Sequence, residues 1–395
     1  MASARSRKDA AARRSSAKTA CDVLLVSLGT TPGLRVSDRL LANALAEAGV
    51  RVAATRVGVG LIGRLRRFYP LTDLIEAYAA RRALLAALQR VQPRALLFST
   101  TTSALLAPTV GLPYAVWFDA PAHLNRPGPQ NALLHRLERA RFERARLLLP
   151  WSEPALRSAP ASHGRLLLLP PPILSGGAAH ATATASDPSS HQRRPRFVAY
   201  TPDPKAKGLD LLVRAWLHCE HLGGALGGHV SGVKSGAGRP RLEVFGIERE
   251  RARAWLARRG LPLPASVRVL GRRSEQEFRK HLVGAVAFVH AARWEDFGRA
   301  PLEALALGVP LVTCAAAGPY AALALARRLA PELVAPRDDP SQLAAALVRA
   351  LAISDEDRRR YQVSAARAVE PFTHRHFERT VRRELIPRLL DQPAS

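Results

Sequence analysis

The stretch "ARWEDFGRAPLEALALGVPLVT", residues 292–313, carries the clearest pattern in the chain. It places Glu295 and Glu303 on either side of "DFGRAPL", ahead of an apolar helical segment. Pro301 favours the first turn of a helix, because its missing N–H is no loss there. A helix that begins near Pro301 would place Glu303 in its first turn and Glu295 in the loop before it. Both carboxylates would then face one mouth, together with backbone N–H groups that can bind phosphate oxygens.

A nucleotide sugar needs this combination, because its diols bind carboxylates and its diphosphate binds amides and cations. Spacing alone also allows a simpler interpretation. Glu303 would then only complement the helix dipole, and Glu295 would be a solvated loop residue.

Outward from this stretch, short apolar strands alternate with helical segments in both directions, beginning with the buried strand at 21–29. A helix is expected at 37–49 with Ser37 as its N-cap, and a short helix at 103–111. Such alternation predicts an α/β protein in which helices cover both faces of a parallel sheet. The expected fold is two doubly wound, Rossmann-like domains that face an interdomain cleft.

Changes in composition set the expected boundaries. We expect a disordered basic tail at 1–20, an N-terminal Rossmann-like domain at 21–174, a linker at 175–195, a C-terminal Rossmann-like domain at 196–371 with a flexible insert at 223–238, and a C-terminal helix at 372–390.

The 395 residues include 59 Lys and Arg against 32 Asp and Glu, a net charge of +27. Genomic bias toward arginine accounts for part of this excess, which is spread along the chain. Aromatic residues make up only 6% and do not cluster with the arginines, so no nucleic-acid partner is expected.

No apolar run reaches the ~18–20 residues of a membrane span, and the basic tail lacks the apolar region of a signal peptide. The expected location is cytoplasmic, and the alternative is a peripheral position at the inner face of a membrane. An organelle transit peptide is the alternative for the tail. The three cysteines are far apart and are expected to be free thiols.

The segment "EDFGRAPLEALALGVPLV" resembles the signature of retaining glycosyltransferases of family 4 (glycosyl transferases group 1), which have the GT-B fold. Asp296 stands where the family usually has glycine. Upstream, "AYTPDPKAKGLDLLVRAW" resembles the family's strand, loop and helix, with Lys207 in place of its lysine. The resemblance covers residues 196–351 well and the N-terminal half only in outline.

The resemblance implies that the domain at 21–174 is the acceptor side and that the domain at 196–371 binds the nucleotide sugar. It also implies a role for each matching position. Glu303 would hold the ribose hydroxyls, Glu295 the hydroxyls of the transferred sugar, and Lys207 the diphosphate. Further donor contacts are expected from the rest of the motif: Phe297, Gly298 and Arg299. The family often has an arginine upstream of the lysine, where this chain has "YTPDP". The second cation is therefore missing or comes from elsewhere, such as Arg299 or Lys205.

In the N-terminal half, the loop at 29–35 matches in position a glycine-containing loop near the donor phosphates, which makes Gly33 a donor-binding candidate. Asp119, in preference to His123, would lie close to the transferred sugar as a catalytic residue; the alternative is an aspartate that caps a turn. The basic, apolar segment at 60–82 could contact an anionic membrane surface, or be an ordinary helix face packed on the sheet.

The implied function is transfer of a hexose-type sugar from a nucleoside diphosphate to a hydroxyl of a saccharide, lipid-linked or small-molecule acceptor, with retention of configuration. The alternatives are a catalytically degenerate donor-binding protein and a GT-B-fold epimerase or phosphorylase. No metal and no cofactor beyond the nucleotide sugar is expected. Asp355 and Asp357 follow Ser354, which predicts acids in the first turn of a capped helix rather than metal ligands.

Overall fold

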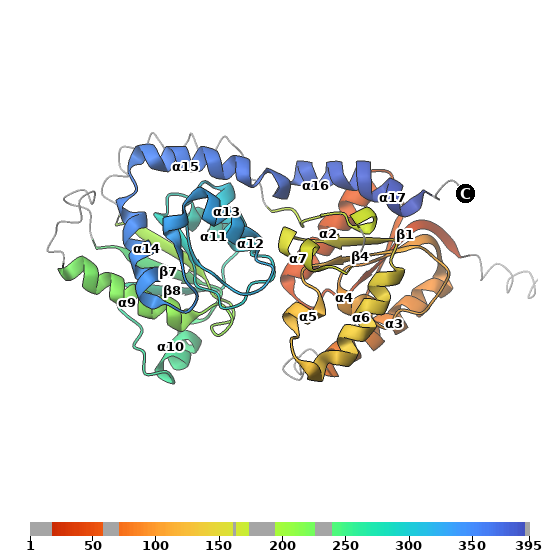
Figure 1. Ribbon diagram of the computed structural model, residues 1–395, viewed down its shortest axis with the longest axis horizontal. Coiled ribbons are helices and arrows are strands. Elements are labelled where there is room, and N and C mark those ends of the chain that lie inside the picture. The colour runs from red at the N-terminus through yellow and green to blue at the C-terminus, as the bar shows by residue number, and fades with distance from the viewer. Residues whose placement is uncertain (1–17, 58–70, 161–162, 174–193, 226–238, 392–395) are drawn as a thin grey trace, which may run out of the picture. The chain divides into compact units, whose positions relative to one another are not determined.

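The structure is a computed structural model that describes residues 18–57, 71–160, 163–173, 194–225 and 239–391. The predicted tail, linker and insert lie largely outside these ranges. The candidate membrane-facing segment at 60–82 is described from Leu71 on, where it is the start of a helix with several buried side chains. The chain divides into two compact units, the first formed by residues 1–172 with 375–395 and the second by 173–374. Each unit is an α/β domain built on a parallel sheet (Figure 1).

The described part of the first unit has a sheet in the order β2-β1-β3-β4-β5, with every pairing parallel. Its strands are β1 (Thr19–Ser27), β2 (Val52–Arg56), β3 (Val91–Phe98), β4 (Tyr114–Phe118) and β5 (Leu147–Pro150). β1 begins inside the predicted tail, because Thr19 pairs with Val91. The strand order reverses between β1 and β3, so the ends of these two strands form the topological switch point.

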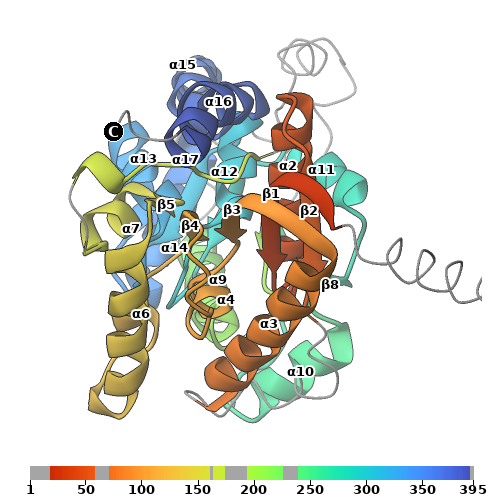
Figure 2. The same cartoon turned by 90° about the vertical axis from the view of Figure 1, so that its right-hand side faces the viewer.

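Helices cover both faces of this sheet (Figure 2). They are α2 (Pro32–Glu47), α3 (Leu71–Arg90), α4 (Thr101–Ala104), α5 (Ala122–Asn125), α6 (Ala132–Arg144) and α7 (Glu153–Ser158). Side chains of α3, α4 and α6 pack with the sheet in one apolar cluster that includes Leu84, Phe98 and Phe142. The strands are apolar and buried over most of their length, because helices cover both faces of the sheet.

Two helices of this unit differ from the sequence prediction. α2 begins at Pro32 rather than Ser37, because Thr31 caps it and accepts a hydrogen bond from the Leu34 N–H at 3.1 Å. Ser37 lies buried inside the helix and is not its cap. The short helix ends at Ala104, capped at its start by Thr100, and the remainder of the predicted helix at 103–111 is a loop.

The chain returns to the first unit at its C-terminal end. Helix α16 (His374–Thr380), a wider turn at Val381–Leu385 and α17 (Ile386–Leu390) follow one another. Phe377 of α16 packs against Trp117 of β4, with ring centroids 6.1 Å apart. The terminal amphipathic helix predicted from the sequence is thus part of the N-terminal unit's core.

The described part of the second unit has a sheet in the order β11-β10-β9-β6-β7-β8, again with parallel pairings. Its strands are β6 (Arg196–Tyr200), β7 (Arg241–Phe245), β8 (Val267–Gly271), β9 (Ala287–His290), β10 (Leu311–Cys314) and β11 (Val334–Ala335). The order reverses between β6 and β9, so these neighbours form the switch point of this sheet.

The helices of the second unit are α9 (Leu209–Ala225), α10 (Arg249–Ala257), α11 (Glu275–Leu282), α12 (Arg299–Ala306), α13 (Ala321–Leu329), α14 (Pro340–Ala352) and α15 (Asp355–Ala368). α9 packs on α14 and runs to Ala225, so it includes the start of the predicted insert at 223–238. Ser354 caps α15 and accepts a hydrogen bond from the Asp357 N–H, as predicted.

Candidate functional site

The candidate site lies at the switch point of the second unit, where loops leave the ends of β6 and β9. Gly208 allows these loops to touch, because it has a φ of +60° and a Cβ there would lie 2.0 Å from the Ala291 carbonyl oxygen. The Arg293 N–H donates to the Ala206 carbonyl at 2.9 Å and closes the contact. Two segments some 85 residues apart in sequence are joined in this way, and the first carries Lys207.

Lys207 and Glu295 form a close ion pair across these loops. The Lys207 Nζ lies 2.6 Å from Oε2 of Glu295, whose side chain is buried. Backbone contacts fix the main chain at Glu295, since the Glu295 N–H donates to the Ala317 carbonyl at 2.9 Å. Gly318 lies so close that a Cβ would be 2.4 Å from the Glu295 carbonyl oxygen. The lysine and the first glutamate of the motif are therefore held together.

His290, the last residue of β9, is a third member of this group. Its Nε2 lies 2.9 Å from the same Oε2 of Glu295. Burial lowers the pKa of His290, although Glu295 opposes this shift, so the imidazole beside the carboxylate is neutral at neutral pH. Sequence reasoning missed His290; the available signal was its position at the end of a strand, five residues before Glu295.

Glu295 is ionised in this setting. Burial by itself would raise its pKa, but the close contact with His290 and the charge of Lys207 lower the pKa to about 2. One carboxylate oxygen, Oε2, is thus used by both partners. The group is a fixed, negatively charged acceptor at a strand end.

Glu303 lies further along α12. That helix begins at Arg299, after Gly298 in a left-handed conformation with a φ of +85°. It starts two residues before Pro301, so Glu303 falls just beyond the first turn and not within it.

The entry to α12 is tightly packed. A Cβ on Gly298 would lie 2.6 Å from the Tyr320 ring, so this entry requires glycine. Phe297 is buried beside Phe372, with ring centroids 6.0 Å apart.

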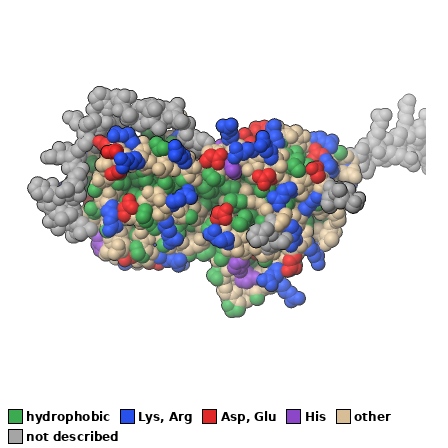
Figure 3. All heavy atoms as spheres, turned by 45° about the horizontal axis from the view of Figure 1, so that its top comes forward, with side chains coloured by type: hydrophobic (Ala, Val, Ile, Leu, Met, Phe, Trp, Pro, Cys, Tyr) green, Lys and Arg blue, Asp and Glu red, His purple; other side chains and the backbone are tan. Residues whose placement is uncertain are grey.

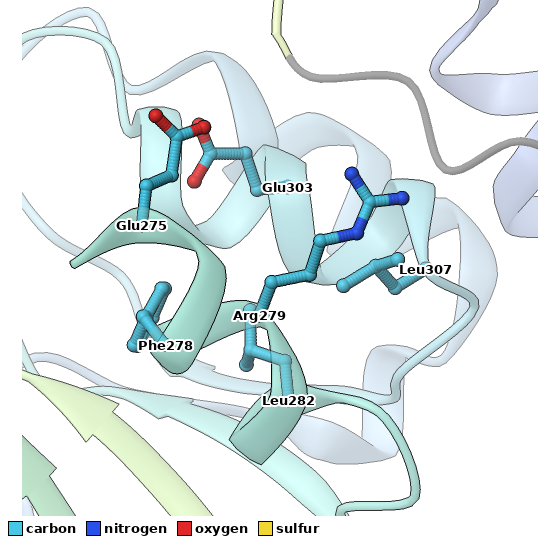
Figure 4. A pocket seen from close by; sticks show the side chains of 6 residues that line it. All are labelled: Glu275, Phe278, Arg279, Leu282, Glu303 and Leu307. Carbon is cyan, nitrogen blue, oxygen red and sulfur yellow. The ribbon is translucent and has the colours of Figure 1, made fainter.

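Glu303 faces Glu275 of α11. Figure 4 shows their carboxylates next to each other, in a small pocket that Arg279 also lines. Burial raises the pKa of Glu303 to about 7; the Glu275 charge adds to the rise, while Arg299 and Arg279 oppose it. Glu303 therefore changes its charge near neutral pH. Glu275 was not predicted from the sequence, since no spacing links it to Glu303.

The other cations of this region, Arg293, Arg299 and Lys205, differ in their surroundings. Arg293 forms a bidentate pair with Asp210, at 2.7 and 2.9 Å. Burial lowers the pKa of Arg299, which lies close enough to Glu303 for the two charges to interact. Lys205 is exposed on the β6–α9 loop.

In the first unit, the two candidates lie near strand ends. Gly33 is exposed in the first turn of α2, so it belongs to a helix and not to the predicted loop. Asp119 follows β4 and accepts a hydrogen bond from its neighbour, the Ala120 N–H, at 2.8 Å. His123 is exposed on α5. Both readings of Asp119, catalytic residue and turn cap, remain compatible with this geometry.

The sequence also did not predict a polar cluster at the switch point of the first unit. The Ser27 hydroxyl, at the end of β1, donates to the buried Asp38 carboxylate. Burial raises the pKa of Asp38 to about 6, and the hydrogen bond from Ser27 and the nearby Ser99 hydroxyl oppose the rise. Ser99 follows β3, so the cluster joins the two strands at which the order reverses.

Across the described residues, no group of three or more His, Cys, Asp or Glu side chains is arranged to hold a metal ion. No helix in the described ranges is long and apolar enough to cross a membrane. On the face in Figure 3, Lys and Arg side chains are interspersed with Asp and Glu.

Comparison with known proteins gives one sequence family. Residues 196–352, within the second unit, match the family described as glycosyl transferases group 1. No curated protein sequence matches the chain.

Several solved structures share the fold of nearly the whole chain. Sucrose-phosphate synthase from Thermosynechococcus elongatus is 18% identical with a TM-score of 0.67, and the match covers 91% of this chain and 96% of that one. A glycosyltransferase from Rickettsia africae is 13% identical with a TM-score of 0.63, covering 95% and 100%. An α,α-trehalose-phosphate synthase (UDP-forming) from Burkholderia vietnamiensis is 16% identical with a TM-score of 0.63, covering 92% and 96%.

These matches establish the GT-B fold of two Rossmann-like domains. The group 1 match, together with the fold, supports a glycosyltransferase. The predicted fold class is confirmed.

Proposed function

We propose that this protein transfers a sugar from a nucleoside diphosphate to a hydroxyl acceptor, with retention of anomeric configuration. One observation carries the proposal. Lys207 and Glu295, far apart in sequence, meet 2.6 Å apart at the switch point of the domain that matches glycosyl transferases group 1. Ligands of open parallel sheets bind at such switch points.

In the proposed complex, Glu295 accepts hydrogen bonds from hydroxyls of the transferred sugar through the carboxylate that His290 and Lys207 hold. Glu303 binds the ribose hydroxyls. Lys207 neutralises the diphosphate, with N–H groups at the start of α12, around Gly298, as further donors. Phe297 shapes the entry to that helix, and Arg299 is the candidate second cation.

The chemical step breaks the bond between the anomeric carbon and the diphosphate oxygen, and forms a bond from that carbon to the acceptor oxygen. The acceptor proton passes to the departing diphosphate on the same face of the sugar, so configuration is retained and no separate base is needed. Charge develops on the leaving diphosphate, where fixed cations and amides are most effective. The proposed mechanism needs no metal, because Lys207 and the N–H groups at the start of α12 would stabilise the departing diphosphate.

The acceptor is assigned to the N-terminal unit, where Asp119 would lie near the transferred sugar and Gly33 near the donor phosphates. The acceptor class stays open among saccharides, lipid-linked saccharides and small molecules. Because the synthase that shares this fold is UDP-forming, uracil is the first nucleobase to test.

The test is thermal unfolding of wild type and Glu303→Ala with saturating UDP, GDP and ADP in turn. A ligand at a hundred times its dissociation constant stabilises the native state by ~2.7 kcal/mol. One nucleotide should raise the wild-type midpoint, and the variant should lose most of that shift. If no nucleotide and no nucleotide sugar shifts it, the donor site is degenerate and the proposal fails.

Activity is then measured as release of the nucleoside diphosphate from the matching sugar donor, with and without EDTA. Retention is read from the anomeric configuration of the product by NMR. Donor binding without release, across saccharide and lipid-linked acceptors, would favour the donor-binding, non-catalytic alternative. An inverted product would contradict the retaining mechanism.

A further inference from the structure

The first unit contains a cavity that is separate from the candidate site of the second unit. Its volume is about 170 Å³. It is lined by Leu96 and Phe98 of β3, the loop from Ala107 to Leu112, Tyr114 of β4, and Arg141 and Arg144 of α6. Tyr114 is the first residue of β4, whereas Asp119 follows the last, so along β4 the cavity lies at the end opposite to Asp119.

The cavity exists because the connection from β3 to β4 is mostly a loop. α4 ends at Ala104, and the chain then crosses the sheet without a helix between α3 and α6. The loop is held from both sides, since Arg81 of α3 donates to the Leu106 carbonyl at 3.2 Å and Arg141 of α6 donates to the Leu105 carbonyl at 3.0 Å. A loop fixed in this way fills less of the space above the sheet than a helix would, and leaves a gap over β3 and β4.

The inside of the cavity is apolar. Phe98 and Leu96 are fully buried, and the Phe98 and Tyr114 rings meet edge to face with centroids 5.7 Å apart. An apolar cavity of ~150 Å³ is large enough to take up a molecule the size of benzene. A short hydrocarbon chain or ring therefore fits this one.

The rim is basic. Arg144 is exposed and Arg141 half-buried, and the Tyr114 hydroxyl donates to the Arg141 carbonyl at 2.6 Å. Burial raises the pKa of Tyr114, and the charges of Arg141, Arg144 and Arg165 oppose the rise. Within the described ranges, none of these three arginines forms an ion pair with a carboxylate.

Arginines in the last turn of a helix also offset the partial negative charge of its carbonyl end. Helix position alone would therefore explain Arg141 and Arg144. It does not explain an apolar cavity beside them. A cavity with apolar walls and a cationic rim is complementary to an amphiphilic anion.

We propose that this cavity binds a small amphiphilic anion, with its hydrocarbon part between β3, β4 and the loop at 107–112 and its carboxylate paired with Arg144 and Arg141. The site is separate from the proposed transferase site and does not depend on that function. It would give the N-terminal unit a second ligand, distinct from donor and acceptor.

The experiment is calorimetric titration of the full chain with octanoate, octanol and octylammonium, which share a chain and differ in charge. Octanoate should bind up to about fivefold tighter than octanol, since an ion pair near the surface contributes up to ~1 kcal/mol. Octylammonium should bind most weakly. Equal affinities for all three, or no binding of octanoate, would overturn the proposal.

Two variants locate the binding. Arg144→Glu should weaken octanoate binding about tenfold while leaving octanol binding unchanged. Arg136→Glu, an exposed arginine of the same helix outside the cavity lining, is the matched control and should have a much smaller effect. Val110→Phe fills the cavity and should abolish binding of both octanoate and octanol.

Circular dichroism shows whether Val110→Phe folds; Arg144→Glu, on the surface, keeps the test valid if it does not. Unchanged octanoate affinity in Arg144→Glu would disprove the site. An equal loss in Arg144→Glu and Arg136→Glu would point to the general charge of α6, and would equally contradict it.

Discussion

The imidazole Nε2 of His290 lies 2.9 Å from Oε2 of Glu295, and the side chains of both residues are buried. His290 is itself held from behind, because its carbonyl accepts the Thr313 hydroxyl at 3.0 Å and its ring lies 5.2 Å from that of Tyr320. The histidine thus connects the core of the sheet to the carboxylate proposed to bind sugar.

His290→Phe should lower kcat about 10- to 100-fold, since loss of the polar imidazole contact lets the Glu295 carboxylate leave its position. The KM for the nucleotide-sugar donor should change little, because ribose and diphosphate contacts are kept. His290→Gln should recover part of the rate by restoring a polar contact. The matched control is His281→Gln, which breaks another histidine–glutamate contact of this unit, 2.6 Å to Glu243, and should lower stability alone. Equal kcat in wild type and His290→Phe would remove His290 from the mechanism.

Glu295 should make stability depend on acid pH. Its pKa falls from an ordinary 4.5 to about 2 in the fold, so the fold favours the ionised form. The resulting stabilisation is present above about pH 4.5 and is lost as the pH falls toward 2. Urea unfolding should show Glu295→Gln less stable than wild type by about 3 kcal/mol at pH 7, with the difference shrinking toward pH 2. A difference that stays constant with pH would show that Glu295 is not ionised in the native protein.

Glu303 should make nucleotide binding depend on neutral pH. Burial and the Glu275 charge raise its pKa to about 7, and ribose hydroxyls bind better to an ionised carboxylate. Affinity for the nucleotide should therefore increase as the pH rises from 6 to 8. Glu275→Gln removes the like charge, lowers the pKa of Glu303 and should move the midpoint of this increase to lower pH.

The matched control for that shift is Glu220→Gln, which removes an exposed acidic charge from α9 of the same unit. Calorimetric titration of each variant across the pH range gives the midpoints. Should Glu275→Gln and Glu220→Gln share the wild-type midpoint, the two facing carboxylates do not interact.

Lys207 should be needed for the diphosphate. Lys207→Ala is expected to weaken binding of the nucleoside diphosphate about 10- to 100-fold, the range for a lost hydrogen bond between charged groups of ~1.5–3 kcal/mol. Binding of the nucleoside alone should be unaffected. Lys205→Ala, two residues away and exposed, is the matched control and tests whether that lysine is the second cation. The roles would be reversed if Lys205→Ala caused the larger loss.

The fold class follows from sequence because parallel strands buried on both faces appear as continuous apolar runs between helices. The helix starts are harder to place. Ser37 has the right side chain for an N-cap, yet Thr31 before Pro32 forms the cap, because a proline at the first position fixes the helical φ. In the segment at 103–111, Pro108 and Gly111 oppose a helix, and the structure has a loop there.

The candidate site was partly visible in the sequence. Glu295, Glu303 and Lys207 stand out because their motif has a fixed spacing. His290 and Glu275 do not, since their significance depends on which strand ends and helices become neighbours in space. Sheet order brings β6 next to β9, and only that order places Lys207 and His290 on one carboxylate.

At Gly298, two effects of a substitution can be separated: the cost of the left-handed backbone and the clash with Tyr320. Gly298 and Gly260 both have a left-handed backbone, with φ of +85° and +66°. An alanine at Gly260 would meet no atom within 4 Å, whereas one at Gly298 would lie 2.6 Å from the Tyr320 ring. Gly260→Ala should therefore cost only the backbone term, about 1–2 kcal/mol of the free energy of unfolding, and leave activity unchanged.

Gly298→Ala should cost more than that, by an amount that reports the contact with Tyr320. Because Tyr320 is buried against His290, displacement of its ring should also disturb Glu295 and reduce kcat. Urea unfolding of Gly298→Ala, Tyr320→Leu and the double variant forms a cycle whose coupling energy isolates the clash. A coupling near zero, with Gly298→Ala no less stable or active than Gly260→Ala, would show that the glycine serves the backbone conformation alone.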